Sequence, residues 1–153
     1  MAQVAGRAGR RDEQGMVIIQ TRQPDAPVLE MVSRNDYTGF FNWQMLERSA
    51  FNYPPYTRLV SVTVKGTDMR AVENTAMSIA ACLAKLFGQD RVLGPDAPPV
   101  SKVMYSHIRR IMIKARLEQT STAIREKISQ AVSSTARETG LSGVTVSFDA
   151  DPQ

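Results

Sequence analysis

The chain has 153 residues, which suits one domain and an appended segment. Its 42% hydrophobic and 22% charged residues are typical of a globular protein, and the net charge of +4 permits nucleic-acid binding without requiring it. One cysteine and one histidine exclude an internal disulfide and leave no zinc site. The sequence shows no signal peptide and no apolar run of membrane-spanning length, so we expect a cytoplasmic protein without membrane contact.

Residues 3–10 read Q-V-A-G-R-A-G-R, in which Arg7 follows Gly6 and Arg10 follows Gly9. Glycine lets a backbone turn tightly and approach a ligand, and the arginine fork suits phosphate oxygens. In a helix both guanidinium groups would lie on one side. From the residues alone, this segment is either a phosphate-binding element or a basic N-terminal stretch.

The next stretch predicts one strand and two helices. The apolar run 14–21, rich in β-branched residues, is typical of a short buried strand. Residues 28–32 favour a short helix, and Asn35 or Asp36 can cap a second helix that runs to about Phe51. The apolar positions of that second helix are Tyr37, Phe40, Phe41, Met45 and Leu46.

The segment Tyr53-Pro54-Pro55-Tyr56 predicts a stiff, extended hinge, because two successive prolines fix their φ angles. We therefore expect a boundary here, with residues 1–56 on one side and a domain of residues 57–153 on the other.

Residues 57–153 alternate strand and helix patterns. The predicted elements are a strand over 59–65, a helix capped by Asp68 and ended by Gly88, a loop over 94–99, a strand over 105–117, a helix ended by Gly140, and a strand over 144–150. This order predicts an α+β fold, an α/β sandwich of the split-βαβ, ferredoxin-like type, with helices on one face of a sheet and the other face open for binding.

The strand over 105–117 lies in a basic stretch, since residues 102–118 hold five basic residues and one acidic residue. Its core face is expected to hold Ile111, Ile113, Ala115 and Leu117. Arg110, Lys114 and Arg116 then project from the other face, where they can follow a phosphate backbone with little sequence preference. Tyr105 is either a base-stacking partner or a packing residue. The same stripe also suits an acidic protein tail, and a solvated strand face is the plainest alternative.

The segment 3–10 closely resembles motif VI of superfamily-two helicases, which lies on the second RecA-like lobe and contacts ATP bound on the first. The resemblance implies that Arg10 is the arginine finger, that Arg7 makes a second γ-phosphate contact, and that Gln3 positions the nucleotide or couples it to DNA. Gly6 and Gly9 complete this ATP site, which also requires Mg²⁺. Val4 departs from the common helicase form, which often has arginine at this position.

Together with the segments at 14–21, 53–56, 92–95 and 149–152, this motif resembles the end of the PriA family, the replication-restart DNA helicases of bacteria. The resemblance covers essentially the whole chain. It implies a fragment in which 1–56 is a remnant of a RecA-like lobe and 57–153 binds DNA or partners. The parent would be an ATP-dependent 3′-to-5′ helicase that restarts stalled forks and assembles the primosome. Its implied partners are forked or single-stranded DNA, single-strand-binding protein and primosome proteins, and zinc is implied in a cysteine-rich region that this sequence lacks.

Three hypotheses, which differ in function class, are compatible with the sequence. No G-x-x-x-x-G-K-[ST] loop and no evident Walker B strand is present, so we expect that this polypeptide alone does not hydrolyse ATP. The chain is then either a helicase fragment, a separate nucleic-acid-binding module, or a protein-docking module. The octet of residues 3–10 favours the helicase fragment, because a separate binding module would not need an ATP-contacting motif.

Overall fold

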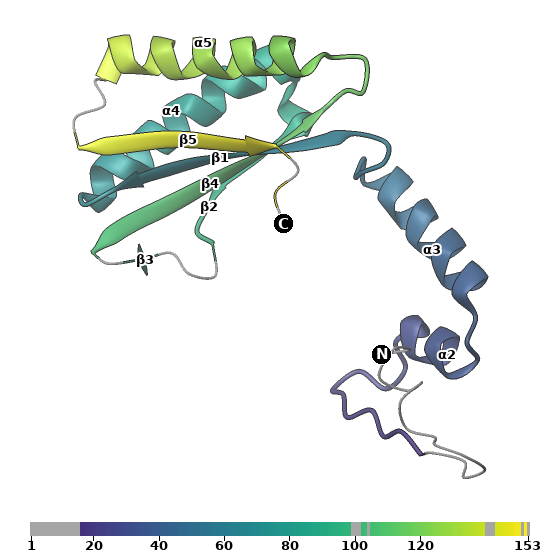
Figure 1. The fold of residues 1–153 in the computed structure, drawn as a ribbon. Coiled ribbons are helices and arrows are strands. Elements are labelled where there is room, and N and C mark those ends of the chain that lie inside the picture. The colour runs from purple at the N-terminus through teal and green to yellow at the C-terminus, as the bar shows by residue number, and fades with distance from the viewer. Residues whose placement is uncertain (1–15, 99–101, 104, 140–142, 151, 153) are drawn as a thin grey trace. The chain divides into compact units, whose positions relative to one another are not determined.

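The computed structural model describes residues 16–98, 102–103, 105–139, 143–150 and 152 (Figure 1). The chain divides into two units, residues 1–50 and 51–153. The sequence predicts a boundary after Tyr56, whereas this division falls after Ala50. The turn that contains Tyr53 and Tyr56 therefore belongs to the second unit.

The first unit contains both predicted helices. Helix α2 (Pro27–Ser33) begins with a proline, whose fixed φ suits the first helical position. Helix α3 (Tyr37–Ala50) begins after Asp36, whose Oδ1 accepts a hydrogen bond of 2.7 Å from the Gly39 N–H. Of the two predicted caps, the structure therefore uses Asp36, which satisfies one of the free N–H groups at the helix start.

The strand expected over 14–21 is not present in its described part. Residues 16–21 lie outside any strand, and Met16 and Ile18 are 82% and 81% exposed. A strand is stable only where a neighbouring strand pairs with its N–H and C=O groups. The described residues of this unit contain no strand that does so.

The second unit is a twisted antiparallel sheet with helices on one face (Figure 1). Its strands are β1 (Arg58–Gly66), β2 (Val92–Asp96), β3 (Lys102–Val103), β4 (Ser106–Ala115) and β5 (Val144–Ala150), and its helices are α4 (Met69–Phe87), the short 3₁₀ helix η1 (Gln89–Arg91) and α5 (Ser121–Thr139). The strand order is β2-β4-β1-β5, with β3 paired to β4. This order and the two helices confirm the α+β class and the split-βαβ arrangement.

The core lies between the sheet and helices α4 and α5. Val62, Val64, Ile111 and Ile113 on the sheet are fully buried, as their alternation predicts. The helices contribute Val72, Ala76, Ile79, Leu83, Ile124, Ile128 and Ala131. Each fully buried Val, Leu or Ile side chain contributes roughly 1.5–3 kcal/mol. Leu117, expected in the core, is 48% exposed because β4 ends at Ala115 and the alternation ends with it.

Strand β2 was not predicted, because its Gly94 and Pro95 suggest a loop. It nevertheless pairs with β4 through Val92 opposite Ile113, and the pairing is irregular further along the strand. β2 ends the strand order, and an edge strand tolerates a proline because the missing N–H need not bond a neighbour. The positive φ of Gly94, 92°, suits the irregularity.

The segment expected to be an extended hinge is instead a turn. The N–H of Tyr56 donates to the carbonyl oxygen of Tyr53 at 3.0 Å. The Thr57 hydroxyl, which is almost fully buried, donates to the Asn52 carbonyl oxygen at 2.7 Å. Two prolines limit the chain's freedom, but they are compatible with a closed turn as well as with an extended conformation.

Candidate nucleic-acid interface

The sheet face opposite the helices carries a polar row centred on β4. Because Ile111 and Ile113 face the helices, the alternate residue Arg110 lies on the open face, where its side chain is exposed. In the register of the sheet it lies between Asp96 of β2 and Thr63 of β1. This position places one guanidinium near the middle of the open face, with an acidic neighbour on one side.

Lys114 does not extend a basic stripe, and this corrects the predicted placement of its side chain. It is only 8% exposed, and its Nζ donates a hydrogen bond of 2.6 Å to the Phe51 carbonyl oxygen. The same Nζ lies 4.1 Å from the centre of the Tyr53 ring. The segment before β1 folds back over the end of β4 and covers this lysine, so its ammonium is engaged within the fold.

Arg116 and Tyr105 lie at opposite ends of β4. Arg116 follows the last residue of the strand, so it does not belong to the strand face, although it is exposed as expected. Tyr105 precedes the strand, is 82% exposed and has a positive φ of 67°, which is uncommon for tyrosine. Its ring is therefore available for stacking.

Arg109, a neighbour of Arg110 in sequence, serves the fold. Its Nε donates to Glu73 Oε2 on α4 at 2.6 Å, and its side chain is 13% exposed. The two adjacent arginines thus face opposite sides of the sheet. The basic count along β4 overstates the number of cations available to a ligand.

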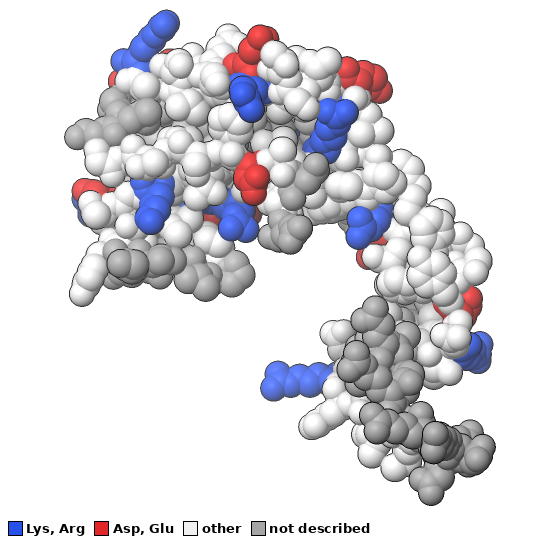
Figure 2. Space-filling model, in the orientation of Figure 1, with Lys and Arg blue, Asp and Glu red and all other residues white. Residues whose placement is uncertain are grey.

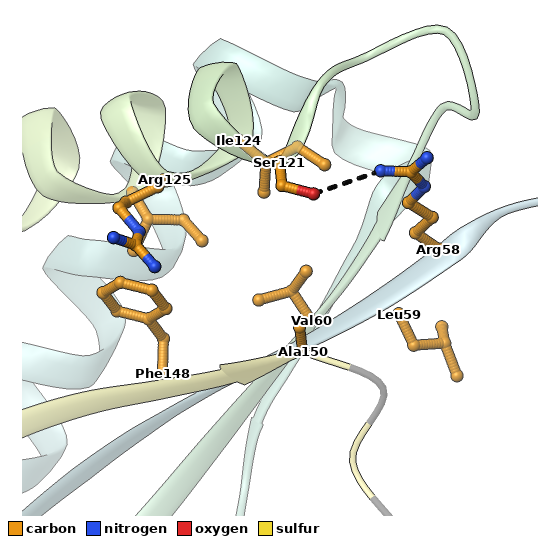
Figure 3. Close-up of a pocket in the computed structure, with 9 residues that line it drawn as sticks. Arg58, Leu59, Val60, Ser121, Ile124, Arg125, Phe148 and Ala150 are labelled. Atoms are coloured by element: carbon orange, nitrogen blue, oxygen red, sulfur yellow. Dashed lines mark hydrogen bonds between the residues drawn. The ribbon is translucent and has the colours of Figure 1, made fainter.

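A pocket of about 180 Å³, which we call the α5 pocket, lies between the start of α5, the start of β1 and the end of β5. Arg58 and Arg125 flank an apolar floor that includes Val60 and Phe148 (Figure 3). The Arg58 guanidinium donates to the Ser121 hydroxyl at 3.3 Å, whereas Arg125 and Phe148 line the other side of the pocket in Figure 3. Sequence reasoning missed this site, because its residues come from three distant segments and no local pattern joins them.

On the side of the second unit that Figure 2 shows, charge is not concentrated in one region. Figure 2 shows basic and acidic side chains interspersed over α5 and the strands on the side in view, without a continuous basic band among the described residues there. Individual side chains such as Arg110 therefore define the candidate interface better than the net charge of +4 does.

Comparison with known proteins decides the family. The sequence model of the primosomal protein N C-terminal domain matches residues 49–153. This chain belongs to the PriA family. The match begins two residues before the second unit, so the PriA C-terminal domain and the sheet unit are the same part of the chain.

Curated relatives agree with this assignment. The chain is 36% identical over 115 residues to the replication restart protein PriA of Synechocystis, an alignment that covers 74% of the chain. It is 33% identical to the Bacillus subtilis PriA and 32% identical to the Treponema pallidum PriA, each over 99% of the chain. These alignments span only 14%, 19% and 22% of the respective relatives, so the chain corresponds to a small part of a PriA protein.

The residues expected to contact ATP, which are Gln3, Gly6, Arg7, Gly9 and Arg10, lie outside the described residues. Cys82 packs against the core of the PriA C-terminal domain. Within the described part of the chain, no group of three or more His, Cys, Asp or Glu side chains is placed to hold a metal ion. No helix described there has both the length and the apolar character of a membrane span.

Proposed function

We propose that this chain is part of a bacterial replication-restart helicase that acts in the cytoplasm, and that its 51–153 unit holds forked or single-stranded DNA near the motor. The match of the primosomal protein N C-terminal domain to this unit carries the proposal. The exposed Arg110 on the open sheet face supports it, because phosphate contacts from arginine give affinity with little sequence preference.

The arrangement of the side chains sets the expected strength of binding. With Lys114 engaged by the fold, Arg110 and Arg116 are the cations of the predicted stripe that remain exposed. Each phosphate neutralised on a single strand contributes about −0.7 to the slope of log K against log salt, so two contacts give about −1.4. Tyr105 adds a stacking surface for a base.

Fluorescence anisotropy of a labelled single-stranded oligonucleotide, titrated with the 153-residue chain at several salt concentrations, tests this proposal. Arg110→Ala should weaken binding and reduce the salt slope by about 0.7. Arg137→Ala, at an exposed position in the last turn of α5, removes the same charge and should leave the affinity near that of the parent. Equal affinities of parent and Arg110→Ala would overturn the role of the open face.

We also propose that the first residues contribute to an ATP site in the longer protein, with Arg10 as the finger, Arg7 as a second γ-phosphate contact and Gln3 as the positioning residue. Gly6 and Gly9 would let the backbone approach the nucleotide. The support is the octet itself and the family membership. Mg²⁺ would accompany the nucleotide and neutralise phosphate charge.

In a complete PriA-family protein that carries this segment, Arg10→Ala should reduce DNA-stimulated ATP hydrolysis by on the order of 10³-fold, because the guanidinium stabilises charge that develops as the γ-phosphoryl leaves. DNA affinity should change little. ATP hydrolysis near the parental rate at saturating DNA would refute the assignment of Arg10.

Protein docking is a second candidate function, favoured by the α5 pocket. Two arginines beside an apolar floor suit a peptide tail with acidic residues and an apolar end, as in single-strand-binding proteins, or a similar segment of a primosome protein. A labelled peptide of that composition should bind the parent chain. Arg125→Ala should weaken its binding, while Arg137→Ala should not. Peptide binding that is equal in all three proteins would exclude the α5 pocket.

A further inference from the structure

A second, more polar pocket lies where the turn before β1 meets the end of β4. Its volume is about 270 Å³, and its lining includes Arg91, Arg116, Tyr56 and Asn52. We call it the junction pocket. Half of these side chains come from the turn, and the other half from η1 and the residue after β4. The junction pocket therefore exists only while the turn is folded against the sheet.

Arg91 is held in place by the backbone of β4. Its Nη1 donates to the carbonyl oxygen of Lys114 at 3.2 Å. A guanidinium has five N–H donors, so this bond orients the group and leaves most of its donors for another acceptor. A pre-oriented guanidinium loses less conformational entropy when it binds a ligand.

Arg116 supplies the second guanidinium at the other side of the junction pocket. It is exposed, and Glu118 is the acidic residue that also lines the pocket. No ion pair joins Glu118 to either arginine in the described part of the chain. The two arginines and the one carboxylate leave the junction pocket with a net positive charge, while the tyrosine and the asparagine offer polar groups.

We propose that the junction pocket binds a phosphate group, with the guanidinium groups of Arg91 and Arg116 as its main donors. Planar guanidinium groups match the oxygens of phosphate, and a polar pocket of this size admits one phosphate group. The proposal rests on the proposed function in one respect, since a backbone phosphate of bound DNA is the expected source. Free phosphate has the same chemistry and is the alternative source.

Binding there has a consequence for the turn that follows the first unit. Tyr56 and Asn52 lie on that turn, so a phosphate bound between them and the arginines would hold the turn against the sheet. Lys114 already fastens the same turn through the Phe51 carbonyl. A strand of DNA in the junction pocket would thus stiffen the turn at the start of the PriA C-terminal domain.

The experiment uses ¹⁵N-labelled 153-residue chain and inorganic phosphate as the probe, with sodium chloride at matched ionic strength as the blank. Phosphate should shift the backbone amide signals of Tyr56 and Thr57 in the parent. Arg116→Gln should weaken this response about ten-fold, whereas Arg137→Gln, which removes an arginine from α5, should not. Arg116→Lys keeps the positive charge but lacks the planar guanidinium group, so its response to phosphate should lie between those of Arg116→Gln and the parent. The spectra themselves report whether each variant is folded.

A labelled single-stranded oligonucleotide, followed by anisotropy, distinguishes the sources. If DNA is the source, Arg116→Gln should lower the salt slope by about 0.7, as Arg110→Ala does. Phosphate shifts without oligonucleotide binding would support the junction pocket for free phosphate and overturn the proposed DNA function. A different outcome would overturn the junction pocket alone. In that outcome, oligonucleotide binding depends on Arg110, but phosphate does not shift the amide signals of Tyr56 and Thr57. The Arg116→Gln variant would then bind the oligonucleotide as tightly as its Arg137→Gln control.

Discussion

Lys114 and Tyr53, which are 61 positions apart in the sequence, form a cation–π contact in which the ammonium lies 4.1 Å from the ring centre. The same ammonium donates to the Phe51 carbonyl oxygen at 2.6 Å. Through these contacts the Lys114 side chain, near the end of β4, holds the segment that leads into β1. Lys114, which the sequence suggests as a DNA contact, therefore stabilises the fold instead.

Replacing Lys114 with methionine tests whether its contacts with Phe51 and Tyr53 stabilise the fold. The variant loses a charge-assisted hydrogen bond and a cation–π contact, so we expect the free energy of unfolding to fall by about 2 kcal/mol. Urea unfolding followed by circular dichroism measures this change. Lys65→Met, on the exposed part of β1, should cost little. A Lys114→Met protein as stable as the Lys65→Met protein would show that the contact contributes nothing measurable.

Arg109 and Arg110 should respond in opposite ways to alanine substitution. Arg109→Ala breaks the 2.6 Å ion pair with Glu73 and should lower stability by about 1 kcal/mol, because the pair is only partly shielded from solvent. Its oligonucleotide affinity should stay near the parental value. Arg110→Ala should keep the stability and lose affinity. A double-mutant cycle with Glu73→Ala isolates the ion pair, and a coupling energy near zero would contradict its role.

Asp68 makes the stability of the second unit depend on pH. Its Oδ1 accepts hydrogen bonds from the Ala71 N–H at 3.1 Å and the Arg70 N–H at 2.7 Å. These bonds, the Ala71 bond foremost, hold the pKa of the carboxyl below its ordinary value of 3.8. Because the unfolded chain then binds the proton more readily, the stabilisation is present above pH 3.8 and is lost as the pH falls through the lowered value.

Asp68→Asn isolates this effect, since the amide oxygen still accepts a hydrogen bond but carries no charge. The parent should be more stable than the variant at pH 7, and the difference should shrink below about pH 4. Thermal unfolding across that range, followed for both proteins, measures it. A difference that is constant with pH would mean that the cap acts without its charge.

Residues 16–21 should exchange their amide hydrogens much faster than β1. The apolar side chains Met16 and Ile18 are exposed, and these residues form no strand in which ladder bonds would protect them. Hydrogen exchange read by mass spectrometry compares this stretch with residues 58–66. Similar protection in the two segments of a monomeric sample would show that 16–21 is paired with a partner segment.

Much of the second unit follows from its sequence alone. The valines at 60, 62 and 64 alternate with polar residues, and such a period-two pattern buries one face only when the segment is a strand. Asp68 and the spacing of apolar residues after it likewise determine a capped helix, because the cap bonds and the helical repeat are local. These local rules were sufficient for the order of strands and helices, and hence for the fold class.

The environment of individual cations depended on the tertiary structure. Arg110 and Lys114 share one face of β4 by alternation, yet only the folding of residues 51–57 over the strand end buries Lys114. The arginines of the α5 pocket and of the junction pocket come together from segments that no sequence period relates. The alternation along a strand determines toward which face of the sheet a side chain points. Only the packing of segments distant in sequence determines whether that side chain is exposed to solvent or contacts another part of the chain.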